Sequence, residues 1–307
     1  VPLPPAHDAQ VRHPRANRWI LRLLLPRYAW RLRSLLERMH AESALFFMDG
    51  ATMASTTERL GLRLEAPRML PVVLETAGRR RRTGATDATD RLRVVWLGRL
   101  ADFKMPTLVH LAERLAAWAA ESGTAVELHV IGRGPEAARL RTLPRHDRFT
   151  IIEVGERTGD ALADYLVTHA DLLAGMGTSA LEGAALGIPT VLLHIAYGPL
   201  TGRHRFGWLF DAPGYSLGDV IPDLAGGSTD RSLETILEGY RASAAEWSDR
   251  THTYCLSSHG IERWAGPFLE AVDGTHFRWS DLPPALYQPG VFRRTYQLMR
   301  HARRKAG

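Results

Sequence analysis

From residue 92 onward, short apolar runs alternate with longer segments whose apolar residues recur at helical spacing. The runs are rich in branched side chains, which is typical of buried parallel strands, and the longer segments are typical of amphipathic helices. Such alternation implies right-handed crossovers, so we expect a Rossmann-like α/β fold, a parallel sheet with helices on both faces. The expected strands are 93–97, 125–131, 149–154, 172–174 and 188–193, and the expected helices are 107–120, 136–143, 160–169 and 180–186.

The amino-terminal part has a weaker pattern. Residues 11–40 predict a basic helix or a pair of helices broken at Pro26, and the only convincing strand is 44–48. A helix is expected at 52–60 and an extended segment at 67–74. We therefore expect a partial α/β domain before the main sheet.

After residue 193 the alternation loosens. The stretch 194–211 has no regular period, and helices are expected at 232–241, 257–272 and 286–304. The segment 77–91 combines four consecutive arginines with small and charged residues and lacks apolar periodicity, as an interdomain linker does. The predicted division is a partial amino-terminal domain at 1–76, the linker at 77–91, the main domain at 92–280 and a basic helix at 281–307.

Composition narrows the class of protein. With 307 residues and 45% apolar content the chain can bury a large core, and a single cysteine excludes an internal disulfide. No apolar run approaches the ~18 residues of a membrane span. These features, together with the lack of a secretory signal, favour a cytoplasmic protein.

Charge is concentrated at both ends. The net charge of +6 arises from basic segments 1–40 and 291–307 flanking an acidic body. Segments 11–40 and 291–307 are compatible with an anionic membrane surface, which would make the protein peripheral on the inner face of the plasma membrane. The four arginines of the linker have no interleaved aromatic residues to stack on bases, so we expect no nucleic-acid partner.

A glycine-rich turn joins the strand at 172–174 to the next helix. Gly175 and Gly177 allow close approach of a ligand to the backbone, and the helix that follows Thr178 and Ser179 offers free N–H groups suited to phosphate. Glu182 lies one turn inside the helix. A capping box, in which Ser179 caps the helix and Glu182 bonds back, is the alternative interpretation of the same residues.

Several short motifs follow each other in a specific order: Gly98-Arg-Leu with Lys104, Val130-Ile-Gly-Arg-Gly134, Val154-Gly155, Ala170-Asp171-Leu and the run from Ser179 to Val191. In order and spacing they resemble the carboxyl-terminal domain of family 4-like glycosyltransferases of the GT-B fold, of the type found in polysaccharide biosynthesis. The resemblance covers about residues 92 to 195. Gly132-Arg-Gly134 lacks the third glycine of a dinucleotide fingerprint, so no NAD is expected.

The resemblance implies roles for particular residues. Arg99 and Lys104 would hold the diphosphate of a nucleotide-sugar donor, and Glu182 would accept hydrogen bonds from its ribose. The remaining donor-nucleotide contacts are expected from Gly98, Val154, Gly155, Gly175, Gly177, Thr178 and Ser179. No metal motif is visible in the sequence, so we expect no metal and no other cofactor. The leaving diphosphate would then be stabilised by side-chain cations and helix-end amides.

Function is expected from the same resemblance. It implies a hexosyltransferase that retains configuration and moves a sugar from a nucleotide-diphosphate donor to a glycan or lipid-linked acceptor in cell-surface polysaccharide synthesis. The sequence departs from the family at Ala174, where an acidic residue is usual, and we expect the front half of the acceptor domain to be lacking. A non-catalytic homologue that binds a nucleotide or a partner, and a nucleotide-sugar epimerase, remain alternatives.

Other residues carry less information. His194 and His204 are open to either a catalytic or a structural role, whereas His259, at a helix start, is expected to be structural. Asp49 is the one amino-terminal aspartate at a strand end, a place that suits a catalytic base or a turn equally.

Overall fold

The computed structural model describes residues 18–75, 90–200, 204–220 and 231–282. The chain forms two compact units. The larger contains residues 48–51 and 70–266, and the smaller contains residues 1–47, 52–69 and 267–307.

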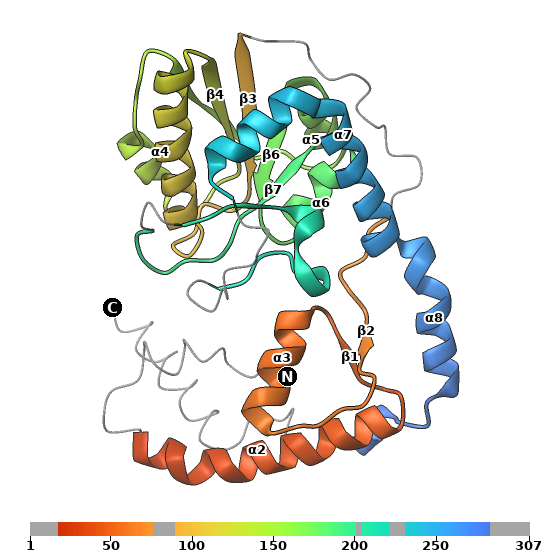
Figure 1. The fold of residues 1–307 in the computed structure, drawn as a ribbon. Coiled ribbons are helices and arrows are strands. Elements are labelled where there is room, and N and C mark those ends of the chain that lie inside the picture. Colours follow the sequence, from red (N-terminus) through yellow and green to blue (C-terminus); the bar gives the residue numbers. More distant parts are fainter. Residues whose placement is uncertain (1–17, 76–89, 201–203, 221–230, 283–307) are drawn as a thin grey trace. The chain divides into compact units, whose positions relative to one another are not determined.

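The larger unit is built on a six-stranded sheet in the order β5-β4-β3-β6-β7-β8 (Figure 1). Its strands are β3 (Arg91–Leu97), β4 (Ala125–Ile131), β5 (Phe149–Gly155), β6 (Leu172–Gly175), β7 (Thr190–Leu192) and β8 (Gly207–Trp208). All neighbours are parallel except β7 and β8, which pair antiparallel. The predicted Rossmann-like parallel sheet is confirmed.

Helices cover both faces, as the alternation of buried residues along β3 requires. Val94 and Trp96 face the core shared with α4 (Met105–Ser122) and α7 (Leu233–His259), whereas Val95 and Leu97 face the core shared with α5 (Gly159–His169). Figure 1 shows α4 and α7 on the same side of the sheet. Helix α6 (Thr178–Ala185) packs against β6 and β7 on the same side as α5. Gly183 lies directly against the Leu173 side chain, so a side chain at position 183 would clash with it.

A buried ion pair between Arg93 and Asp171 connects the start of β3 to the residue before β6. The Asp171 carboxylate accepts hydrogen bonds from the backbone N–H of Arg93 at 2.8 Å and from its guanidinium at 3.2 and 3.0 Å. The bond to Asp171 raises the pKa of Arg93. Asp171, which belongs to one of the motifs of the family resemblance, therefore has a structural contact here that ties two adjacent strands together.

Most predicted elements of the larger unit are present within one or two residues, with three differences. The segment 136–143 is a 3-10 helix, η2 (Ala137–Thr142), and the supposed loop 194–211 contains β8. The helices expected at 232–241 and 257–272 are instead α7 and α8 (Ile261–Gly274), which meet at Gly260. Helix α7 also includes residues 242–256, and it is kinked at Ser243, which has non-helical backbone angles of φ −152° and ψ 50°.

Among the described residues, the smaller unit contains helices, including the end of α8 from Pro267 onward, and a pair of very short parallel strands. The strands β1 (Phe46–Phe47) and β2 (Arg68–Met69) are much shorter than expected. The helix α2 (Arg18–Ala41) is continuous, so the break predicted at Pro26 is absent; the rest of the predicted segment, 11–17, lies outside the described residues. Most of α3 (Gly50–Leu60) belongs to this unit, where Leu60 and Leu62 pack on Leu32.

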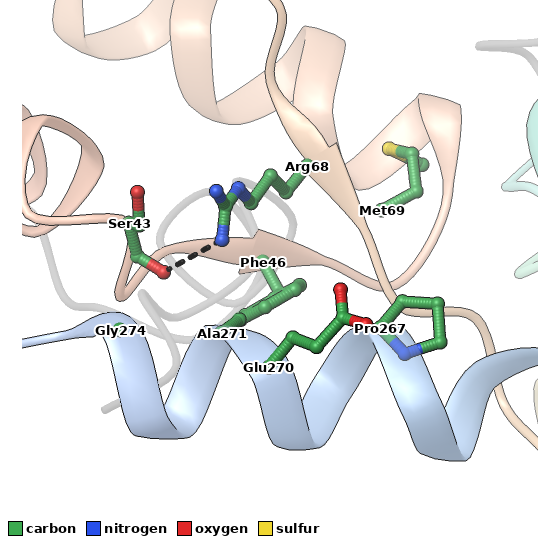
Figure 2. A pocket seen from close by; sticks show the side chains of 8 residues that line it. All are labelled: Ser43, Phe46, Arg68, Met69, Pro267, Glu270, Ala271 and Gly274. Atoms are coloured by element: carbon green, nitrogen blue, oxygen red, sulfur yellow. Dashed lines mark hydrogen bonds between the residues drawn. The ribbon is translucent and has the colours of Figure 1, made fainter.

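A cavity of ≈ 610 Å³ lies in the smaller unit. It is lined by Ser43, Phe46, Arg68, Met69, Pro267, Glu270, Ala271 and Gly274. Figure 2 shows the Arg68 guanidinium directed at the Ser43 carbonyl, which accepts a bond of 3.5 Å. Phe46 also contacts Phe268, with ring centroids 5.9 Å apart. The ring contact joins α8 to β1, and the hydrogen bond joins β2 to the turn before β1.

The unit boundary near the carboxyl terminus falls at Pro267, inside α8, rather than at residue 280. The helical periodicity of the sequence runs through this point without a break, and so it contains no signal for the boundary. The predicted linker 77–91 lies outside the described residues except for its last two, and the predicted basic helix 286–304 lies outside them entirely. Among the described helices, none combines the length and apolarity needed to cross a membrane.

Candidate functional site

The order of the strands identifies one edge of the sheet as the natural place for a ligand. The chain builds β3, β4 and β5 outward in one direction and then returns to place β6 on the other side of β3. In open α/β sheets, ligands bind outside the carboxyl ends of the strands where the order reverses. The last residues of the two central strands, Leu97 and Gly175, are paired, so the loops that follow them leave the sheet side by side.

Glycines hold the loops after β3, β4 and β5 together backbone to backbone. The N–H of Gly98 donates to the Ile131 carbonyl at 3.0 Å, and the N–H of Gly132 donates to the Gly155 carbonyl at 2.8 Å. Gly132 has a φ of +137°, and a Cβ there would lie 1.9 Å from the Gly98 carbonyl oxygen. Only glycine fits this position, because both its backbone angle and its surroundings exclude a side chain.

Two cations follow β3. Lys104 is the residue before α4, and its Nζ lies 3.3 Å from the position that a Cβ on Gly98 would take. Arg99 is exposed, with its guanidinium carbon 6.0 Å from the centroid of the Phe103 ring. Burial, with a further contribution from Arg99, holds the pKa of Lys104 below its usual value.

Neither cation is paired with an acidic side chain of the described residues. A half-buried ammonium without a counter-charge is unfavourable, and an anionic ligand would compensate it. The structure therefore places Arg99 and Lys104 together at the carboxyl end of the first strand of the sheet, as the sequence predicted.

The amino end of α6 supplies free donors in the loop that leaves the sheet next to the loop with these cations. Gly177 precedes the helix with φ 65° and ψ −148°, and no side chain caps it. The N–H of Gly177 donates to the Leu217 carbonyl at 2.6 Å, whereas the N–H groups of Thr178 and Ser179 have no acceptor among the described residues. Thr178 is exposed, so these two N–H groups are available to an anion.

The capping-box interpretation of the same segment is wrong. Ser179 lies in the first turn of α6 and not at its cap, because the strand before it ends at Gly175 and Gly177 takes the turn. Glu182 lies one turn beyond Thr178 on the same face of the helix and is half-buried. Its predicted contact with a ribose stays a prediction.

Ala174 lies inside β6 and is completely buried, paired with Trp96 on one side and Val191 on the other. A carboxylate at this position would be enclosed by the sheet without a partner. The departure from the family pattern at residue 174 thus has a structural consequence: this position cannot present an acidic group to a ligand.

A cavity of ≈ 650 Å³ opens at the same edge, over the ends of β3, β4 and β5. It is lined by Leu97, Gly98, Arg99, Ile131, Gly132, Arg133, Gly134, Glu156, Arg157 and Thr158. Three of its residues are arginines and one is an acid, so the lining favours an anionic ligand.

Of the predicted site residues, Gly98 and Arg99 line this cavity. Val154 and Gly155 do not; the Val154 side chain packs on the core with α5, and the Gly155 carbonyl already accepts from Gly132. The lining residues Arg133, Glu156, Arg157 and Thr158 were missed. Arg133 lies two residues after the predicted strand 125–131, and the other three lie in the loop after the predicted strand 149–154. The rule that ligands bind at strand ends could therefore have found them.

The histidines left open by the sequence have protein partners. His194 is buried and its Nδ1 accepts from the backbone N–H of Asp219 at 3.1 Å. His204 lies with its ring centroid 5.5 Å from that of His110 and 6.3 Å from that of His194. The structural role expected of His259 agrees with its contact of 2.8 Å between Nδ1 and the Val72 carbonyl.

No group of three or more histidine, cysteine or acidic side chains suited to hold a metal ion occurs within the described part of the chain. Asp49 lies directly before α3, in the turn that follows β1. The site at the carboxyl edge therefore consists of cations, backbone donors and one carboxylate in the cavity lining.

No protein-family model and no curated protein matches the sequence. Solved structures similar to it include a variant of TarM from S. aureus in complex with fondaparinux, α-GlcNAc-glycerol and UDP, at 14% identity and a TM-score of 0.46 over 74% of this chain and 43% of that one. The lipopolysaccharide outer core galactosyltransferase WaaB in its apo form matches at 14% identity and a TM-score of 0.47 over 74% of this chain and 61% of that one.

A third similar structure is WaaG, a glycosyltransferase involved in lipopolysaccharide biosynthesis, at 15% identity and a TM-score of 0.44 over 76% of this chain and 63% of that one. The chain spans 43% to 63% of the length of these three proteins. Every one of the three TM-scores is below 0.5, so the likeness carries no weight in the assignment of function.

Proposed function

We propose that the protein is a glycosyltransferase that uses a nucleotide-diphosphate sugar as donor. The observation that carries this proposal is that Arg99, Lys104 and the uncapped amino end of α6 follow the ends of neighbouring strands, where the strand order of the sheet reverses. Two side-chain cations and two free N–H groups match the charge of a diphosphate. The adjoining cavity at the ends of β3, β4 and β5 has room for the nucleoside.

In this proposal the protein acts on the leaving group. The bond between the sugar carbon and the diphosphate oxygen breaks, and its electron pair stays on that oxygen. Lys104 and Arg99 stabilise the charge that grows there, together with the N–H groups of Thr178 and Ser179. Because these groups are fixed by the sheet before the donor arrives, little reorganisation is needed during the reaction.

Further parts of the proposal follow the family resemblance. Glu182 accepts hydrogen bonds from the ribose, configuration is retained, and the transferred sugar is a hexose. The acceptor is a glycan or a lipid-linked glycan in cell-surface polysaccharide synthesis, and segments 11–40 and 291–307 hold the protein to the inner face of the membrane. No metal takes part, since the cations and helix-end donors provide the stabilisation.

A non-catalytic role is the second candidate, and Ala174 favours it. Ala174 is completely buried in β6 and has no acidic group. The site could therefore bind a nucleotide without transferring a sugar. Such a homologue would keep the diphosphate contacts of Arg99 and Lys104.

Two measurements test the proposal in sequence. The first is calorimetric binding of UDP, GDP and ADP to the wild type, to Glu182→Ala and to Glu121→Ala, a matched control in the last turn of α4. We expect one nucleotide to bind, with about tenfold weaker affinity in Glu182→Ala because a charge-assisted hydrogen bond is lost, and with unchanged affinity in the control.

The second measurement follows release of the bound nucleotide from its sugar conjugates in the presence of a membrane glycan extract. Release that depends on the extract, with sugar recovered in the glycan, supports the transferase. Binding without any release in the presence of the extract favours the non-catalytic candidate, and no binding at all rejects both.

A further inference from the structure

An ion pair stands at the cavity over β3, β4 and β5. Arg133, in the loop after β4, contacts Glu156, in the loop after β5, with 2.6 Å between Nε and Oε2. Both residues line the cavity. The side chains are 79% and 47% exposed, so each keeps hydrogen-bonding capacity toward the open side of the cavity.

The carboxylate of Glu156 would disfavour a ligand that carries only negative charge. Glu156 is the one acidic residue in the described lining, beside Arg99, Arg133 and Arg157. A carboxylate repels phosphate, so its favourable contacts with a nucleotide are to hydroxyl groups of the ribose or to N–H groups of the base. The proposed function assigns the ribose to Glu182, which leaves the N–H groups of the base for Glu156. The two side chains therefore offer the base one acceptor group next to one donor group.

The four common bases differ in how they meet such a pair. Guanine presents the acceptor O6 beside two donors, N1–H and the N2 amino group, along one edge. Uracil presents a single N–H between two carbonyl oxygens, which a carboxylate would repel. Adenine and cytosine each present one amino group beside a ring acceptor, so a carboxylate can form only one bond with them.

We infer that the base recognised here is guanine, which makes the nucleotide of the proposed donor a guanosine diphosphate. The Glu156 carboxylate accepts from N1–H and the N2 amino group, and the Arg133 guanidinium donates to O6. This inference rests on the proposed function, since it assigns the base of the same donor. The bidentate contact to a carboxylate is a strong one, whereas an exposed ion pair is weak, so the pair opens readily to admit the base.

Inosine diphosphate is the most direct probe, because it keeps O6 and N1–H and lacks only the N2 amino group. We expect GDP to bind the wild type about tenfold more tightly than IDP, as the loss of one hydrogen bond to a charged group predicts. UDP and ADP are expected to bind more weakly than IDP. Isothermal titration calorimetry of all four nucleotides gives these ratios.

Two variants test whether Glu156 causes the preference for GDP over IDP. Glu156→Gln removes the charge and one of the two acceptor oxygens, so the ratio of GDP to IDP affinity should fall to about twofold or less. Glu153→Gln, in β5 and outside the cavity lining, is the matched control and should keep the wild-type ratio.

The outcomes separate this inference from the proposed function. Equal binding of GDP and IDP, or tighter binding of UDP or ADP than of GDP, overturns the guanine assignment and leaves a nucleotide site in place. A GDP preference that persists in Glu156→Gln also overturns it. Absence of binding by all four nucleotides rejects the proposed function and the inference together.

Discussion

Replacing Lys104 by Met should separate the stability of the fold from the affinity of the site. The ammonium is half-buried beside Arg99, and burial lowers its pKa, so at neutral pH the charge is unfavourable in the free protein. Methionine keeps a flexible apolar stem of similar length without the charge. We therefore expect the free energy of unfolding to be unchanged or to rise by about 1 kcal/mol.

The affinity of Lys104→Met for the nucleotide should decrease. A charge-assisted contact with phosphate contributes about 1.5–3 kcal/mol, so Lys104→Met should weaken nucleotide binding by a factor between about 10 and 150. At about 100 times its dissociation constant the nucleotide stabilises the wild type by about 2.7 kcal/mol. A 30-fold weaker variant at the same concentration keeps less than about 1 kcal/mol of that stabilisation.

Thermal unfolding with and without nucleoside diphosphate measures both effects. The wild type should shift by roughly 5 °C on binding, and the variant by roughly 1–2 °C from an equal or higher starting temperature. Arg145→Met is the matched control, since Arg145 lies before β5 at the opposite edge of the sheet and is exposed. A full shift in Lys104→Met would refute the phosphate contact, and a large loss of stability without ligand would refute the account of its burial.

Two further predictions concern the framework of the site. Gly132→Ala should lower the free energy of unfolding by about 3 kcal/mol or more, because its Cβ would lie 1.9 Å from the Gly98 carbonyl oxygen. Gly155→Ala, where φ is +79° but nothing lies within 4 Å, should lose only about 1 kcal/mol; equal losses in urea unfolding would contradict the clash. Burial and the nearby imidazoles of His110 and His194 lower the pKa of His204 to about 4. Since the unfolded ring takes up its proton at about 6.5, stability should fall as the pH drops from 6.5 through 4, by up to about 3 kcal/mol. His204→Phe should flatten that fall in denaturant titrations at pH 7 and 4.5, and identical pH dependence would contradict a half-buried, neutral His204 ring.

The regular part of the fold could be predicted from the sequence because its signals are local. Between residues 92 and 193 the apolar period alone identifies the strands and helices, and glycines mark the strand ends. Arg99 and Lys104 could be placed beside Gly98 for the same reason. The amino end of α6 was located correctly, although its cap was not, because a Ser three residues before a Glu resembles a capping box wherever it occurs.

Other features depend on which segments meet in space, and the local pattern of apolar residues does not predict them. The pairing of β6 with β3, which brings the two halves of the proposed phosphate site to neighbouring strand ends, follows from the strand order, and β8 is too short to show a period. The Arg133–Glu156 pair joins loops 23 residues apart in sequence and only becomes a site through the register of β4 and β5. The sequence by itself determined most elements between residues 92 and 193, the fold class and the cations at the first strand end. The tertiary structure alone decided which loops adjoin, which glycine must lack a side chain, and where α8 passes from one compact unit to the other, because each of these is set by packing between distant segments.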